Sequence, residues 1–94
     1  MKDKSKRDEQ LTKRTCKLIS QGCSIYLRKK NDDWYLHAWT NIAAGWDKAQ
    51  WGRIENALEI MDLKTAFAIA PLYGCKVVSY NHKQNIETVE KVRG

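Results

Sequence analysis

Two segments on either side of Asn31-Asp32 place aromatic and basic side chains at alternate positions. Tyr26 and Arg28 are two residues apart in the first segment, and Tyr35, His37 and Trp39 have the same spacing in the second. Residues two apart in a strand share one face. Aromatic rings that stack on bases beside cations that hold phosphates are typical of proteins that bind single-stranded nucleic acid. The pattern therefore predicts such a face.

These rings also have a purely structural interpretation, because a two-stranded hairpin needs cover and aromatic side chains fill small cores well. Arg28 in the middle of the face argues against full burial, since arginine is almost never buried without a partner. The sequence leaves both alternatives open.

The positive charge is concentrated in the first third of the chain. Residues 1–30 hold ten Lys/Arg and three Asp/Glu, a net +7, whereas residues 31–94 hold seven and eight, a net −1. A basic segment joined to a near-neutral body favours a polyanionic partner. The alternative is a solvated face without a partner. The residues expected to contact phosphates are Lys6, Lys13, Arg14, Lys17, Lys29 and Lys30.

No arrangement of residues indicates catalysis, a cofactor or a metal. The candidates for zinc ligands lack the short spacings of structural zinc sites, so free cysteines acting as small apolar residues are expected. We expect no enzyme activity, because no nucleophile–base order, phosphate loop or carboxylate pair stands out. The zinc candidates considered are Cys16, Cys23, Cys75, His37 and His82.

Length and composition favour one small domain over residues 1–94, with residues 1–5 flexible. No run approaches the roughly 18 apolar residues of a membrane span, and we expect no membrane association. The start of the chain lacks the apolar region of a secretory signal, and three cysteines are an odd number. Both observations predict a reducing, cytoplasmic location.

The elements that position these residues begin with a helix over about 6–20. Ser5 and Asp8 have the spacing of a helix start, and Gln21-Gly22 supplies the stop. A β-hairpin follows over 23–41, with Asn31-Asp32 as its loop. In this register Arg28 faces Tyr35, Leu27 faces Leu36 and Ile25 faces Ala38, which sorts apolar and aromatic side chains onto opposite faces.

The second half predicts one or two helices, a strand and a last helix. Trp51, Ile54, Leu58 and Met61 form an apolar stripe typical of a helix over about 48–61, inside which Gly52 permits a close approach by Trp46 or by the hairpin. Residues 65–70 fit either a short helix capped by Asp62 or a strand before Pro71. Residues 75–80 form a strand, and the apolar spacing of 86, 89 and 92 predicts a short C-terminal helix.

The expected fold is α+β, with about three mainly antiparallel strands and helices mostly on one side. Exposed edge strands also raise the prospect of a homodimer. The first expected function is a non-enzymatic nucleic-acid-binding accessory protein with low sequence specificity, favouring single strands over a specific duplex. The alternative is an inhibitor or modulator of the kind encoded by phages and mobile elements. It would bind a host protein such as a nucleic-acid-processing enzyme.

Overall fold

A five-stranded antiparallel sheet with two α-helices forms the framework of the protein. The computed structural model describes residues 2–44 and 48–91. The strands run in the order β3-β2-β1-β4-β5. The fold is α+β as predicted, but the sheet has five strands rather than three. The elements are α1 (Lys2–Ser20), β1 (Cys23–Lys29), β2 (Tyr35–Leu36), β3 (Trp51–Gly52), α2 (Leu63–Ile69), β4 (Cys75–Asn81), β5 (Ile86–Val89) and 3₁₀ turns at Ile42–Ala44, Ile54–Asn56 and Ala70–Tyr73.

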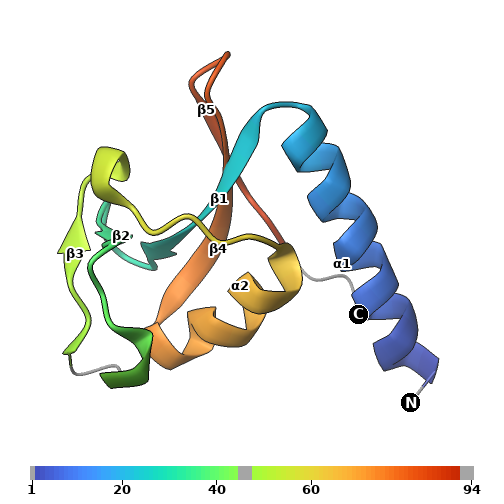
Figure 1. Cartoon of the computed structure of the whole chain (residues 1–94), viewed down its shortest axis with the longest axis horizontal. Helices are drawn as coiled ribbons and strands as arrows, with labels where there is room; N and C mark the ends of the chain where they lie inside the picture. Colours follow the sequence, from blue (N-terminus) through green and yellow to red (C-terminus); the bar gives the residue numbers. More distant parts are fainter. Residues whose placement is uncertain (1, 45–47, 92–94) are drawn as a thin grey trace.

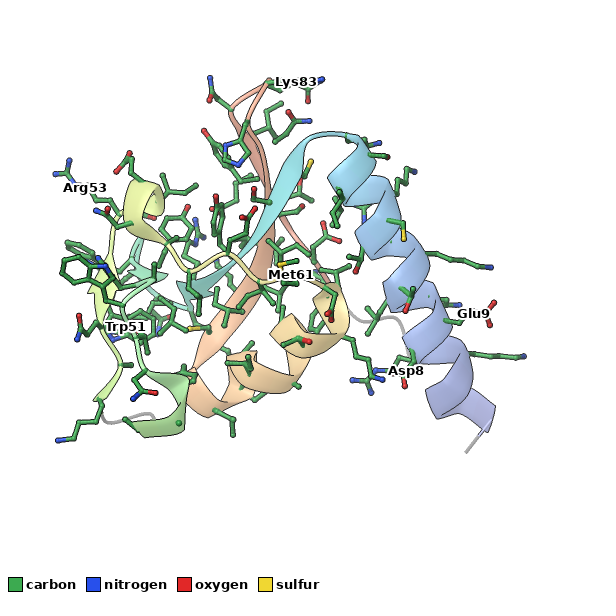
Figure 2. All side chains as sticks on the ribbon, viewed as in Figure 1. Asp8, Glu9, Trp51, Arg53, Met61 and Lys83 are labelled. Carbon is green, nitrogen blue, oxygen red and sulfur yellow. The ribbon has the colours of Figure 1, made fainter. Side chains whose placement is uncertain are left out.

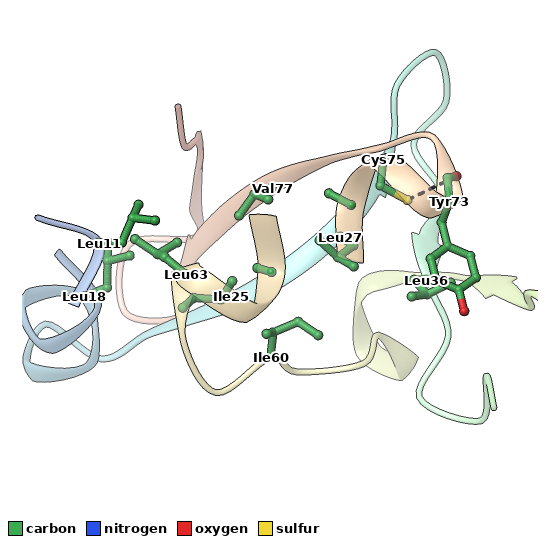
Figure 3. Packing of buried hydrophobic residues seen from close by; sticks show 12 residues of the cluster. Leu11, Leu18, Ile25, Leu27, Leu36, Ile60, Leu63, Tyr73, Cys75 and Val77 are labelled. Atoms are coloured by element: carbon green, nitrogen blue, oxygen red, sulfur yellow. Dashed lines mark hydrogen bonds between the residues drawn. The ribbon is translucent and has the colours of Figure 1, made fainter. Parts of the chain in front are cut away.

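Both helices pack on the same face of the sheet. Leu11 and Leu18 of α1 and Leu63 of α2 join one buried cluster with Ile25 and Leu27 of the central strand β1 (Figure 3). Burying side chains of this kind contributes about 1.5–3 kcal/mol each, so this layer stabilises the packing of both helices on the sheet. In Figure 1, α1 stands at one end of the molecule and β2 with β3 at the other.

Helix α1 is longer than predicted. It begins at Lys2 and ends at Ser20, followed by Gly22 with a positive φ of 77°. That left-handed conformation is the reason for the glycine, because other residues adopt it at a cost. At the other end, the backbone of residues 2–5 is part of the helix. The flexibility expected for residues 1–5 stays a prediction, and Met1 lies outside the described residues.

The hairpin has the predicted register at its turn but not beyond it. Arg28 pairs with Tyr35, and Lys29 N–H donates to the carbonyl of Trp34 at 2.8 Å. However, β2 ends at Leu36, so the expected pairing of Ile25 with Ala38 is wrong. Ile25 instead pairs with Ile60, whose N–H donates to its carbonyl at 2.9 Å.

The helix predicted over 48–61 does not form, and residues 45–47 lie outside the described part. The segment contains β3, one 3₁₀ turn and an extended stretch in which Leu58 N–H donates to the carbonyl of Leu36. Leu58 and Ile60 are two residues apart, so their pattern also fits a strand, and pairing with the hairpin decides between the two. Gly52 does permit a close approach: a Cβ here would lie 2.8 Å from His37 Cδ2.

The ambiguous segment after Asp62 is helical. Asp62 has extended backbone and its carboxylate accepts a hydrogen bond from Thr65 N–H at 2.7 Å, which is the geometry of an N-cap. Thr15 Oγ1 accepts from Leu63 N–H at 2.9 Å and so joins the start of α2 to α1. A 3₁₀ turn containing Pro71 then leads to Gly74 in the left-handed conformation.

We expect Asp62→Ala to lower the free energy of unfolding by about 1 kcal/mol, because one N–H of a short helix loses its acceptor. Urea denaturation followed by circular dichroism measures this loss. Asp62→Asn is the matched control, since asparagine caps helices equally well. Equal stability of the alanine variant and the native chain would contradict the role of the cap.

The predicted C-terminal helix is wrong, because residues 86–89 form the edge strand β5. Asn81 Oδ1 accepts from the N–H groups of Lys83 and Gln84, and Asn85 has a φ of 56°. These contacts turn the chain back onto β4, where Val89 pairs with Val78. The β-branched residues of 86–89 fit a strand better than a helix, which is the signal that the three-residue spacing concealed.

Candidate nucleic-acid interface

The second face of the sheet carries the aromatic residues singled out in the sequence. Because Ile25 and Leu27 face the helices, Ser24, Tyr26 and Arg28 point to the opposite side. Tyr35 lies on this side beside Arg28, with which it pairs. We call this side the aromatic face. It is formed by Ser24, Tyr26, Arg28, Tyr35, His37, Lys76, Val78, Tyr80, His82 and Glu87.

The rings of the aromatic face contact one another edge to face. The Tyr26 ring lies 6.2 Å from that of Tyr35 and 6.4 Å from that of His82, and Tyr80 lies 5.1 Å from His82. Tyr26 is buried by these neighbours. Such edge-to-face pairs add about 0.5–1.5 kcal/mol each beyond the burial of area. Tyr26 is thus a packing residue, and its plane is not free to stack on a base.

Arg28, the predicted phosphate ligand of this face, is neutralised within the chain. Its guanidinium donates to Glu87 at 2.6 Å, and the hydroxyl of Tyr35 donates to the other oxygen of the same carboxylate. Arg28 also lies 3.9 Å from the exposed Asp33. Burial, followed by the hydrogen bond to Glu87, raises the pKa of Tyr35 to about 12. The hydroxyl therefore stays a donor at neutral pH, and the cluster has little positive charge to offer a phosphate.

His37 and Trp39 extend beyond β2. The His37 ring lies over Gly52, its Nδ1 accepts from Trp39 N–H at 3.0 Å, and the two rings are 5.2 Å apart. Trp39 is 80 % exposed, so it is the freest ring of the predicted set. Lys29 lies on the helix side with Nζ 5.0 Å from the Trp51 ring, and Lys30 is exposed at the turn.

The basic residues of α1 lie on two sides of the helix, one toward β5 and one toward solvent. Arg14 points inward and donates two hydrogen bonds to Glu90, at 3.0 and 3.1 Å. Burial works to raise the pKa of Glu90, but the bonds from Arg14 and Ser79 outweigh it, and the pKa is lowered. Hydrogen bonding to Glu90 raises the pKa of Arg14. Arg14 is therefore engaged by a carboxylate of the same chain, and its expected contact with phosphates stays a prediction.

The remaining lysines of the helix form a row on its outer side. Lys6, Lys13 and Lys17 are exposed, and their spacings of seven and four residues place them on one face of the helix. Lys13 contacts Glu9 at 3.4 Å, an exposed pair that contributes little. Figure 2 shows Glu9 on the side of α1 that points away from the sheet. We call Lys6, Lys13 and Lys17 the outer lysine row.

The structure does not join the outer lysine row to the aromatic face. The helix packs on the Ile25 side of the sheet, whereas Tyr26 and Arg28 are on the opposite side. Trp51 and Arg53, which mark the β3 end of the molecule, lie far from α1 in Figure 2. The outer lysine row and the aromatic face are therefore two separate surfaces.

Sequence reasoning missed the acidic residues that organise both surfaces. Glu87 binds Arg28 across 59 residues of sequence, and Glu90 binds Arg14 across 76. It considered His82 as a zinc candidate but did not predict its place on the aromatic face, where its Nε2 lies 2.8 Å from Ser24 Oγ. A nucleophile–base pair needs a third group to orient the histidine. In the described part no carboxylate accepts a hydrogen bond from the His82 ring. The signal in the sequence was the two-residue spacing of Glu87 and Val89, which is typical of a strand and would have placed Glu87 on a sheet.

Searches for other functional groups and for similar proteins give no further assignment. Among residues 2–44 and 48–91, no three His, Cys, Asp or Glu side chains gather where they could hold a metal ion. Burial raises the pKa of the Cys75 thiol to about 11, so this thiol is protonated at neutral pH. No helix in the described part is long and apolar enough to cross a membrane. Comparison with protein-family models, curated proteins and solved structures finds no match to this chain.

Proposed function

We propose that this protein is a non-enzymatic accessory protein that binds the phosphate backbone of nucleic acid with low sequence specificity. The observation that carries the proposal is the outer lysine row, three exposed ammonium groups on one side of one helix in a chain of net charge +6. Lysines in such a row contact phosphates without reading base edges.

The division of basic residues on α1 supports this surface over the aromatic face. Arg14 and Arg28 are engaged by buried or half-buried carboxylates, so their charge is compensated inside the protein. Among the side chains that the structure describes, the ion-pair partner of the outer lysine row is the exposed Glu9. Counterion release requires charge that is free to neutralise phosphates, and the row has that freedom.

Trp39, which is 80 % exposed, provides a smaller, second contact beyond the end of β2. An exposed ring stacks on one unpaired base with about 1–3 kcal/mol. A contact of this kind favours single strands, whereas the outer lysine row accepts either a single strand or a duplex. The proposed partner is therefore single-stranded nucleic acid rather than a specific duplex sequence.

Fluorescence anisotropy with labelled single-stranded DNA, duplex DNA and RNA tests the proposal. Three phosphate contacts predict a slope of log K against log salt of about −2 for single strands and about −3 for a duplex. Raising the salt fourfold should thus weaken binding by about 20- to 40-fold. A lack of binding at low salt, or binding that does not change with salt, would contradict the proposal.

A second candidate function is binding to a host protein, as an inhibitor or modulator of a nucleic-acid-processing enzyme of the kind that phages and mobile elements encode. The observation in its favour is the 80 % exposure of Trp39, because tryptophan is enriched among the residues that dominate protein interfaces. A complex of this type should lose affinity in Trp39→Ala and respond weakly to salt, which separates it from binding to phosphates.

A further inference from the structure

A cleft between α1 and the end of β5 is separate from the outer lysine row. Its volume is about 470 Å³, within the range of small ligand sites. Leu11 and Leu63 are buried at its apolar floor, and charged side chains stand at its rim. Its lining includes Arg7, Leu11, Arg14, Leu63, Val89 and Lys91.

One wall of the cleft is an edge strand with free backbone groups. β5 is the last strand of the sheet and pairs only with β4. Glu90 N–H donates to the carbonyl of Val77 at 2.9 Å. Because successive residues of a strand point their N–H groups to opposite sides, the N–H groups of Glu87 and Val89 point away from β4. They form a template for another strand.

Within the described residues, no free charged side chain protects the edge of β5. Proteins commonly place free charges on an edge strand to prevent pairing. The one charged side chain of β5, Glu87, is turned onto the aromatic face and engaged by Arg28 and Tyr35. Ile86 and Val89 are exposed apolar residues. The edge is therefore open to an added strand.

The rim of the cleft is positively charged. Arg7 and Lys91 are exposed, and within the described part neither has an ion-pair partner. The negative charge of Glu90 is compensated by Arg14. Acidic side chains complement this rim, and an apolar side chain fits the floor between Leu11 and Leu63.

We propose that an extended, acidic segment of a partner protein binds in this cleft and adds to β5 as a further strand. Strand addition gives affinity through main-chain hydrogen bonds, and the cleft gives specificity through alternate side chains. A second copy of this chain fits less well, because a two-fold interface at β5 would bring Arg7 and Lys91 of both copies together. Nucleic acid has no peptide backbone to pair with the edge.

A labelled peptide tests the proposal on the whole protein. The probe is a short capped peptide of glutamates with two central valines separated by a single glutamate, so that both valines point to the same side. Anisotropy should show binding. Arg7→Glu with Lys91→Glu should weaken it by about tenfold, since both rim charges are reversed. Lys48→Glu with Lys83→Glu, which makes the same charge change elsewhere, is the matched control and should change affinity by less than about twofold.

Methylated peptides test the pairing of the backbone itself. An added strand offers only alternate N–H groups to its neighbour. Of two peptides N-methylated at odd or at even positions, one should lose binding and the other retain it. Equal binding of both would overturn strand addition. So would displacement of the peptide by a single-stranded oligonucleotide, or sedimentation showing a dimer that the peptide does not dissociate.

Discussion

Arg14→Met should be among the most destabilising single substitutions on the surface of this protein. The side chain of Glu90 is only 7 % exposed and accepts two hydrogen bonds from Arg14. Removing the arginine leaves a buried carboxylate with Ser79 as its remaining side-chain donor. Breaking a buried ion pair costs about 3–5 kcal/mol, and we expect about 3 kcal/mol because Arg14 itself is 39 % exposed.

The pH dependence of this loss identifies its cause. The pKa of Glu90 is lowered in the folded protein, so its contribution is present above the ordinary pKa of a glutamate and is lost as pH falls through the lowered pKa. In Arg14→Met, burial without the arginine raises that pKa, and protonation then favours the folded state. The unfolding free energies of the two proteins should therefore converge as the pH falls below about 4.

Lys13→Met is the matched control for Arg14→Met, since it removes a charge one position earlier on the same helix. The Lys13–Glu9 pair is exposed on both sides, so its loss should cost less than about 0.5 kcal/mol. Urea denaturation at pH 7 and at a series of lower pH values measures all three proteins. Similar stabilities of the two variants at pH 7 would show that Glu90 does not depend on Arg14.

Arg28→Met should destabilise the protein without weakening its binding to nucleic acid. Arg28 and Glu87 have side chains that are 21 % and 18 % exposed, so Glu87 loses its cation in a half-buried setting. We expect a loss of about 2 kcal/mol, below the range for a fully buried pair because the Tyr35 hydroxyl still donates to Glu87. Affinity for a labelled single strand should change by less than about twofold, since the charge of Arg28 is already compensated.

Arg53→Met serves as the control for this second substitution. Arg53 is exposed and its side chain has no ion-pair partner among the described residues, so stability should change by less than about 0.5 kcal/mol. Thermal unfolding and anisotropy on the same samples measure both properties. If Arg28→Met keeps its stability but loses affinity, the aromatic face is the binding surface and the account of Arg28 is wrong.

Local signals in the sequence were sufficient for the elements whose structure depends on local contacts. The stop at Gly22 and the strand beginning at Cys75 are signalled by neighbouring residues alone, and the hairpin turn places Arg28 opposite Tyr35 as predicted. The cap at Asp62 is local too, although the sequence left helix and strand open there.

Segments whose structure depends on distant partners were not predictable in the same way. Residues 57–60 have an apolar pattern that fits a helix and a strand, and hydrogen bonds to Leu36 and Ile25 select the extended form. β5 is selected likewise by its pairing with β4. Both errors come from applying helical periodicity to short segments that the sheet recruits.

At the candidate site, the ion pairs of the basic side chains could not be predicted from the sequence either. The sequence identified which side chains are basic, but it could not show which of them are compensated. Arg14 and Arg28 find their carboxylates on β5 and directly after it, more than fifty residues away. Among the described side chains, Lys6, Lys13 and Lys17 have no such partner apart from Glu9 on the same helix. Only the tertiary structure separates structural cations from free ones.

The central claim is that the outer lysine row binds the phosphate backbone, and a pair of charge-reversed variants tests it most directly. Lys6, Lys13 and Lys17 are changed to glutamate in one variant, and Lys48, Arg53 and Lys83 in the other. Both changes lower the formal net charge from +6 to zero. In anisotropy with a labelled single strand at low salt, the first variant should lose about tenfold or more in affinity and the second less than about threefold. Equal losses in the two variants would contradict the claim, because binding would then depend on net charge and not on the helix.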